Sequence, residues 1–232
     1  MVRSVLEMQE PMVIRPKTNG QRDMIVDSCD AWLLTPPPVE QLTLYTNYFK
    51  SAADAYRAGM THHRTLAAEN EDAVADLSES NIVVDEAARV LLGDVLVKHG
   101  AEGVKKVETL FDGRTRGEFT RLPYRDQRDV QTEALRRIDA KEPGYTLLDP
   151  VYLAAFRAAH DHFTAAIKRE DATRTARRLG LDALDDLRPT FDKSWTRFVG
   201  MIGPVLGERI GDLVPDFSRE QAKKAKPSTD TK

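Results

Sequence analysis

The sequence matches itself when it is shifted by about 107 residues, and this internal match restricts the possible fold more than any other feature. Phe49 then coincides with Phe156, and Gly93 coincides with Gly200. The other matched positions are Tyr45 and Tyr152, Asp54 and Asp161, Tyr56 and Phe163, Leu77 and Leu184, Asp85 and Asp192, and Gly100 and Gly207. A match at a fixed period is typical of a duplicated structural unit. We therefore expect two copies of one arrangement of secondary structure.

The first copy carries a long apolar stripe over residues 39–79, whose members follow one another at alternating steps of three and four. That spacing places them on one face of an α-helix. The prolines at 36–38 suit the beginning of this helix. Ser80 and Asn81 interrupt the stripe, so we expect a turn there and a return helix that ends near Gly100.

The second copy repeats this pattern with clearer boundaries. Asp149 followed by Pro150 is typical of a helix start, and the stripe continues from Tyr152. Pro189 predicts the turn. The return helix then carries the aromatic residues Phe191, Trp195 and Phe198, whose helical spacing predicts a core position.

Each copy opens with a shorter helix, predicted at residues 21–34 and 123–140, and no stretch alternates with the period of a strand. The pattern predicts an all-α, internally duplicated helical bundle: two long antiparallel helical hairpins with pseudo-two-fold symmetry, each preceded by a shorter helix. The expected segments are 1–19 (N-terminal), 20–99 (first repeat), 100–122 (a linker with glycine and arginine), 123–215 (second repeat) and 216–232 (a flexible polar tail). Two separate three-helix domains are the alternative to one shared bundle.

The composition favours a soluble cytoplasmic protein. The net charge of −3 argues against a generally electrostatic partner such as bulk DNA. One cysteine, Cys29, excludes an intramolecular disulfide framework and suits a reducing compartment. Its place on the apolar side of a helix predicts that it packs as a small hydrophobe. We expect neither a secretory signal nor a membrane span.

The motifs of common catalytic and cofactor sites are missing from the sequence. It has no phosphate-binding glycine loop and no nucleophile elbow. The di-metal sites of ferritin-like bundles need Glu-x-x-His, and none of the five histidines has an acidic residue three positions before it. Ligands with the spacing of a zinc site are also missing. We therefore expect no cofactor, no metal site and no catalytic residues.

Polar residues interrupt the two stripes at matched places. His63 corresponds to Glu170, and Asn70 corresponds to Arg177. If the stripes meet, these four side chains form a polar layer, which either binds a small polar ligand or sets the register of the helices. The alternative is that the stripes become exposed there.

The two copies also differ in charge along the matched part of the long helix. The first is acidic at Glu69, Glu71 and Asp72, whereas the second is basic at Arg174 and Arg178. Opposite charges can attract within the chain or between neighbouring chains, and the latter predicts a self-association interface. The alternative is a pair of solvated faces.

Arginines and aromatic residues also gather between the copies. Arg114, Arg116 and Arg121 lie near Phe119 and Tyr124. Arginine grips carboxylate or phosphate, but neighbouring acidic residues dilute the charge, so a protein partner or an ordinary surface is favoured over nucleic acid.

Together these features predict a non-enzymatic helical structural or interaction protein, a self-associating component or adaptor of a larger assembly. A helical bundle that binds a small molecule or metal through the polar layer is the alternative.

Overall fold

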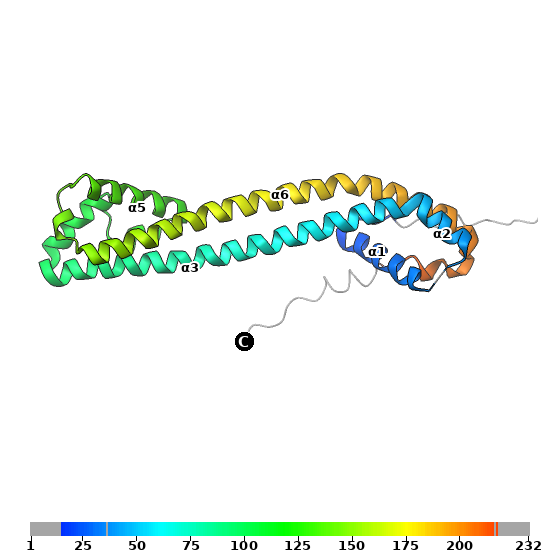
Figure 1. Cartoon of the computed structure of the whole chain (residues 1–232), viewed down its shortest axis with the longest axis horizontal. Coiled ribbons are helices and arrows are strands. Elements are labelled where there is room, and N and C mark those ends of the chain that lie inside the picture. Colours follow the sequence, from blue (N-terminus) through cyan, green and yellow to red (C-terminus); the bar gives the residue numbers. More distant parts are fainter. Residues whose placement is uncertain (1–14, 36, 216, 218–232) are drawn as a thin grey trace, which may run out of the picture. The chain divides into compact units, whose positions relative to one another are not determined.

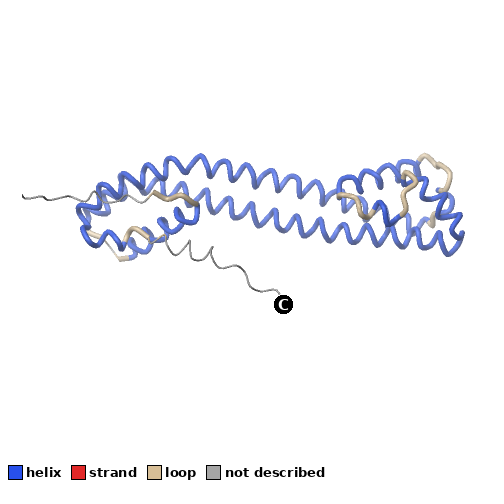
Figure 2. The backbone as a smooth tube through the Cα atoms, turned by 180° about the vertical axis from the view of Figure 1, so that it is seen from behind, coloured by secondary structure: helices blue, strands red, loops and turns tan. Residues whose placement is uncertain are grey.

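The computed structural model describes residues 15–35, 37–215 and 217. Within these residues the chain forms helices and no strand, which confirms the prediction of an all-α protein (Figure 2). The elements in chain order are α1 (Asn19–Leu34), α2 (Val39–Tyr45), η1 (Thr46–Lys50, a π-helical turn), α3 (Ser51–Glu108), η2 (Thr109–Phe111), α4 (Arg116–Phe119), α5 (Tyr124–Asp139), η3 (Tyr145–Leu147), α6 (Pro150–Leu206) and η4 (Gly207–Asp212). The predicted short helices correspond to α1 and α5.

The chain divides into two compact units. Unit 1 contains the chain up to Arg64 together with the part from Leu179 onward, and unit 2 contains Thr65–Arg178. Helix α3 therefore begins in unit 1 and ends in unit 2, and α6 does the reverse (Figure 1). Each predicted repeat contributes residues to both units.

The predicted turn at Ser80 and Asn81 is wrong, because α3 continues through both residues. The Ser80 hydroxyl donates a hydrogen bond to the carbonyl of Asp76 at 2.8 Å, one helical turn back, so the polar side chain is accommodated inside the helix. Leu77 and Val84 lie on either side of this point and are both buried in the core of unit 2. Their burial favours a continuous helix over a turn.

The predicted turn at Pro189 is wrong for a similar reason. Helix α6 contains Pro189 and Pro204 within its length. Proline removes one backbone hydrogen bond from a helix, but Leu184 and Phe191 flank Pro189 and are fully buried in the core of unit 1. Packing on both sides of the proline thus outweighs its local cost.

The predicted linker over 100–122 is largely helical. The end of α3, η2 and α4 occupy most of it. The backbone changes direction at Gly100, where φ is 69° and ψ is −171°. A positive φ favours glycine, because it lacks the Cβ atom that would clash. We refer to this bend as the Gly100 corner.

The core of unit 1 is an aromatic cluster. Phe49 stacks on Phe198 with ring centroids 5.7 Å apart, and it also contacts Trp195 at 5.2 Å. Phe191, Trp195 and Phe198 are fully buried, which confirms their predicted core position. The cysteine of α1, Cys29, is also fully buried in this core, as predicted, and burial raises the pKa of its thiol to about 12.

Helix α1 is held in unit 1 by polar contacts to both long helices. Its N-cap is Thr18, whose hydroxyl accepts a hydrogen bond from the backbone N–H of Gln21. Arg22 forms a two-point contact with Asp192 of α6 at 2.8 and 2.6 Å. On α3, the hydroxyl of Tyr56 bonds to the side chain of Asn19 at 3.1 Å.

Unit 2 has a core of aliphatic and phenylalanine side chains from α3, α5 and α6 together with η2 and α4. Phe111 stacks on Phe119, with centroids 5.1 Å apart. The side chain of Gln127 on α5 donates to Asp85 on α3 at 2.6 Å. Helix α6 begins at Pro150 as predicted, and the Asp149 side chain accepts from the N–H of Val151.

The expected N-terminal segment 1–19 and polar tail 216–232 lie mostly outside the described residues. No described helix combines the length and the apolar character that crossing a membrane requires.

Candidate functional site

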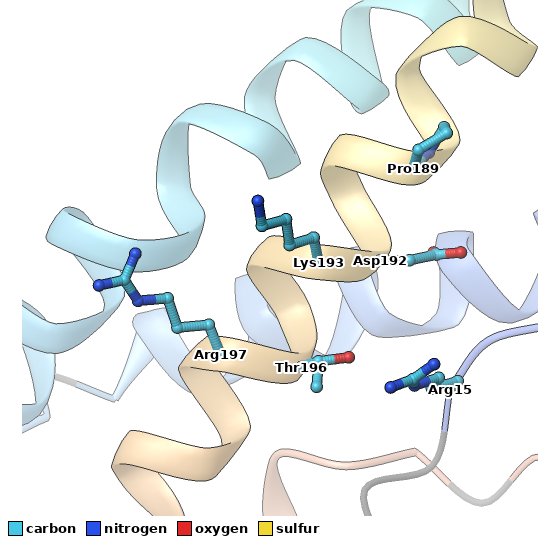
Figure 3. Close-up of a pocket in the computed structure, with 6 residues that line it drawn as sticks. All are labelled: Arg15, Pro189, Asp192, Lys193, Thr196 and Arg197. Atoms are coloured by element: carbon cyan, nitrogen blue, oxygen red, sulfur yellow. The ribbon is translucent and has the colours of Figure 1, made fainter.

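A groove in unit 1 is lined by three cationic side chains, two of them from α6. It has a volume of about 470 Å³. Its lining residues, which define the unit 1 groove, are Arg15, Pro189, Asp192, Lys193, Thr196 and Arg197. Figure 3 shows that Asp192, Thr196 and Arg15 lie on one side of α6, whereas Lys193 and Arg197 extend from the other. The helix is thus flanked by positive charge on both sides.

The one carboxylate of the unit 1 groove is already neutralised. Both oxygens of Asp192 accept hydrogen bonds from Arg22, whose side chain is only 7% exposed. Such a two-point guanidinium–carboxylate contact has a fixed geometry and directs the carboxylate at its partner. In the part of the chain that the structure describes, Arg15 and Lys193 have no carboxylate within ion-pair distance. The groove therefore presents a net positive charge.

The Arg197 side chain is positioned by an aromatic ring. Its guanidinium carbon lies 4.8 Å from the centroid of Tyr48. A cation above a ring face is attracted by the quadrupole of the ring, and the contact leaves the edge N–H groups of the guanidinium able to donate. Arg197 is therefore oriented before any acidic group arrives.

A second groove lies in unit 2 at the Gly100 corner, and we call it the corner groove. Its volume is about 600 Å³. The apolar floor comes from α3 on both sides of the bend and consists of Leu92, Gly93, Leu96, Ala101 and Val104. The polar rim consists of Arg89, Lys105, Glu108 and Arg116. Leu96 is 54% exposed although it is a large apolar residue.

The rim of the corner groove is more basic than acidic. Arg89 pairs with Glu86 one turn away, and Lys105 contacts Glu102 at 3.4 Å. Arg116 comes from α4 and makes no ion pair with a described residue, although its charge acts on Asp85 and Glu86. Unit 2 thus has a partly exposed apolar floor here, and the cations Arg89 and Lys105 on its rim are already paired with acidic neighbours.

The predicted polar layer is not assembled by direct contacts. Asn70, Glu170 and Arg177 belong to unit 2, and no hydrogen bond or ion pair joins them to one another among the described residues. Asn70 is buried with its Oδ1 atom unpartnered, Glu170 lies 3.7 Å from Arg174, and Arg177 is exposed. His63 belongs to unit 1, is half-buried, and has an unpartnered Nδ1 atom.

The acidic and basic stretches both lie in unit 2, and they make one ion pair with each other. Arg169 of α6 contacts Asp76 of α3 at 2.9 Å. Arg174 pairs within its own helix with Asp171 and Glu170. The remaining residues of the predicted faces, and Arg177 beside them, are exposed and have no ion pair within the described chain: Glu69, Glu71, Asp72, Arg177 and Arg178.

The arginine-rich stretch is divided between the surface and internal ion pairs. Arg114, Arg116 and Arg121 are exposed. Arg137 is tied to Asp112 at 2.6 Å and to the carbonyl of Thr109, which fixes η2 against α5. Of the three predicted interaction residues in this stretch, Arg116 alone lines a described groove.

A buried histidine in unit 2 has polar partners on both ring nitrogens. The Nδ1 atom of His160 lies 3.2 Å from Oε1 of Gln131, and its Nε2 atom lies 3.2 Å from the hydroxyl of Thr132. Burial lowers the pKa of His160, and the charge of Arg128 acts in the same direction, whereas Asp161 opposes both. The neutral ring is therefore favoured in the folded state.

We expect unit 2 to lose stability when His160 takes up a proton. Its folded pKa is below the unfolded value of 6.5, so the unfolded chain binds more protons and stability falls as the pH is lowered through 6.5. One such group contributes at most about 1.4 kcal/mol per pH unit. Urea unfolding followed by circular dichroism at pH 7.5, 6.5 and 5.5 should show this slope in the native chain and a smaller one in His160→Gln.

The His160→Gln comparison isolates one group. Asp85 has a raised pKa, mainly because of burial, and acts in the opposite direction at lower pH, but it is present in both proteins. Equal slopes in the native chain and the variant would contradict the role of His160.

No group of three or more His, Cys, Asp or Glu side chains is placed to hold a metal ion in the described part of the chain. No family model, no curated protein and no solved structure matches the chain.

Neither groove was identified from the sequence. Lys193 and Arg197 are four residues apart on α6, a spacing that places them on one helix face, but Arg15 is remote in the sequence and joins them only in the folded unit. The sequence gives only a weak indication of the corner groove, namely the apolar residues that occur on both sides of Gly100.

Proposed function

We propose that the chain is a non-enzymatic helical interaction protein, an adaptor whose unit 1 binds an acidic segment of a protein partner. The observation that supports this most is the unit 1 groove, in which three cations surround a single, already neutralised carboxylate. An acidic segment laid across α6 would meet Arg15 and Thr196 on one side and Lys193 on the other (Figure 3). Charge complementarity of this kind gives specificity and speeds association.

The test uses a hexaglutamate peptide as probe, titrated into the full chain at low and moderate salt. The double variant Lys193→Glu/Arg197→Glu should weaken binding by about tenfold, which corresponds to 1.4 kcal/mol. The matched control is Arg174→Glu/Arg178→Glu, which has the same change of net charge and the same spacing on α6. Equal loss in both variants would show that the peptide responds to net charge alone and would reject the groove.

Self-association through unit 2 is a second candidate. It is favoured by exposed carboxylates on α3 and exposed arginines on α6 that have no ion pair within the described chain: Glu69, Glu71 and Asp72, and Arg177 and Arg178. Changing Arg174, Arg177 and Arg178 to glutamate is then expected to weaken association in sedimentation velocity. A monomer both before and after the change would reject this candidate.

We also propose that the two repeats, residues 20–99 and 123–215, arose by duplication and are related by a pseudo-two-fold axis. Matched positions are buried in both units, as for Phe49 and Phe156 and for Leu91 and Phe198. The matched aspartates behave alike as well. Each accepts hydrogen bonds from a side chain near the beginning of a short helix, Asp192 from α1 and Asp85 from α5.

The alternative function, binding of a small molecule, is no longer supported by an assembled polar layer and depends on one unpartnered buried atom. The buried, unpartnered Oδ1 atom of Asn70 supports a polar ligand in unit 2. Native mass spectrometry of the purified chain distinguishes the alternatives. A small molecule bound in stoichiometric amount would favour the ligand-binding function over the adaptor function.

A further inference from the structure

Polar side chains of three helices meet in one layer of unit 2, where the first half of α5 packs on α3 and α6. The buried face of α5 begins with Gln127 and Gln131, which are both fully buried. It continues with the apolar residues Ala134, Leu135 and Ile138. Buried amides are costly unless their atoms have hydrogen-bond partners. The partners of the two glutamines therefore decide how the first half of α5 is held.

Each of the two glutamines uses one end of its amide in a direct contact. The Nε2 atom of Gln127 donates to Asp85 of α3 at 2.6 Å, and the Oε1 atom of Gln131 lies 3.2 Å from Nδ1 of His160 on α6. The other end of each amide is buried and makes no hydrogen bond to a described residue. One carbonyl oxygen, on Gln127, and one amide N–H group, on Gln131, are thus left over.

Two neighbouring side chains have a buried atom in the same condition. Asn81 lies one turn before Asp85 and contacts its carboxylate through Nδ2 at 3.4 Å, but the Oδ1 atom of Asn81 has no partner. Thr164 lies one turn after His160, and its hydroxyl is also unpartnered within the part of the chain that the structure describes. With the two glutamine atoms, these make four of the seven buried side-chain atoms that lack a partner there. Their concentration in one layer indicates a common ligand.

Thr164 lies on the face of α6 that α5 covers. Gln131 contacts His160, four residues before Thr164, and Arg125 pairs with Asp171, seven residues after it. Positions four and seven residues apart share one helix face. The same two contacts show that α5 and α6 run antiparallel, so Thr164 lies opposite the stretch of α5 between Arg125 and Gln131.

We propose that this layer binds one water molecule, held between the two glutamines of α5, Asn81 of α3 and Thr164 of α6. Buried water typically makes about three hydrogen bonds to polar groups that are otherwise unsatisfied, and it can both donate and accept. The layer offers both kinds of group. The carbonyl oxygens of Gln127 and Asn81 can accept from the water, and the Thr164 hydroxyl and the Gln131 amide can donate to it. The water completes the attachment of the first half of α5, and its site is independent of the unit 1 groove.

A crystal structure of the full chain, at a resolution that shows ordered water, tests the site directly. We expect one water whose oxygen lies roughly 2.7–3.2 Å from at least three of the four atoms. Three results would overturn the proposal: a layer without a water, side chains rearranged so that the four atoms pair with one another, or a bound molecule larger than water.

Nuclear magnetic resonance tests the same site in solution. A long-lived bound water gives nuclear Overhauser effects to the protons beside it, and we expect these at the side-chain amide of Gln131. Thr164→Val removes the hydroxyl and keeps the shape of the side chain, so the effect at Gln131 should fall to about half or less, because the water loses one of its hydrogen bonds. The matched control is Thr173→Val on the same helix, since the Thr173 hydroxyl already donates to the carbonyl of Glu170 at 3.1 Å. This control should leave the effect unchanged.

Thr164→Ser keeps a hydroxyl at the site and should retain the effect at Gln131. Circular dichroism checks that each variant folds, and Thr164→Ser provides the test if Thr164→Val does not fold. An unchanged effect in Thr164→Val, an equal loss in Thr164→Val and Thr173→Val, or loss of the effect in a folded Thr164→Ser would each contradict the proposed site.

Discussion

Replacing Trp195 with alanine is expected to lower the free energy of unfolding of unit 1 by about 3–5 kcal/mol. The indole is fully buried and contacts the rings of both Phe49 and Phe198, at centroid distances of 5.2 and 6.1 Å. Its removal loses the transfer free energy of a large apolar side chain and leaves a cavity that rigid aromatic neighbours cannot fill. The position matched to Trp195 in unit 2 is Ala88, so unit 2 provides no equivalent ring.

The measurement can be confined to unit 1. The chain has two tryptophans, and Trp32, like Trp195, belongs to unit 1. Emission from Trp32 therefore follows the urea unfolding of unit 1 in the Trp195→Ala variant, and circular dichroism follows the whole chain. Trp195→Phe keeps a ring in the site and should cost clearly less. A loss below about 1 kcal/mol for alanine would show that the cluster relaxes around the cavity.

The aromatic core was predictable from sequence because its chemistry is local. Phe191, Trp195 and Phe198 follow the helical period, and no competing structure buries all three on one face. The short helices α1 and α5 were predictable for the same reason, as the apolar residues of each follow the helical period.

The turns were not predictable in this way, because packing against distant parts of the chain decides whether a helix continues through these residues. Ser80 resembles a helix boundary in isolation, yet its hydroxyl bonds within α3 and also lies 3.0 Å from Nδ1 of His162, which is 82 residues away. Pro189 has a known local cost, but buried neighbours on both sides compensate for it. The actual bend, at Gly100, differs from these sites in needing a positive φ.

The grooves were even less predictable, because they are formed by residues that lie far apart in the sequence. A site formed by residues adjacent in one helix, such as Lys193 and Arg197, leaves a trace in sequence spacing. Its third cation, Arg15, does not. Whether Asp192 faces the groove as a free carboxylate or a neutralised one depends on Arg22 of α1, which only the folded unit reveals.

Removing the carboxylate of Asp192 is the second change expected to have a large effect. In Asp192→Ala, the guanidinium of Arg22 stays buried with its two-point partner gone. Breaking a fully buried pair costs about 3–5 kcal/mol. Asp192 is 28% exposed, so water can reach part of the site, and we expect a loss of about 2–3 kcal/mol from unit 1. Tryptophan emission during urea unfolding measures it directly.

The matched aspartate of unit 2 provides the control, because its partner is neutral. Asp85 accepts from the amide of Gln127, so Asp85→Ala leaves an unsatisfied amide in unit 2 where Asp192→Ala leaves an unpaired charge in unit 1. Each variant should therefore destabilise its own unit, and Asp192→Ala should have the larger effect. Circular dichroism, combined with tryptophan emission, assigns the loss to a unit.

A double-mutant cycle separates the cost of the unpaired charge from other effects of Asp192→Ala. Arg22→Met keeps much of the length and apolar stem of the arginine but removes the charge. If the unpaired guanidinium is the cause, Arg22→Met/Asp192→Ala should be more stable than Asp192→Ala alone, since the double variant leaves no charge buried. A double variant whose loss equals the sum of the two single losses would show instead that Arg22 and Asp192 act independently. The attachment of α1 to α6 would then have to come from the apolar contacts of Ile25 and Cys29 in the same core.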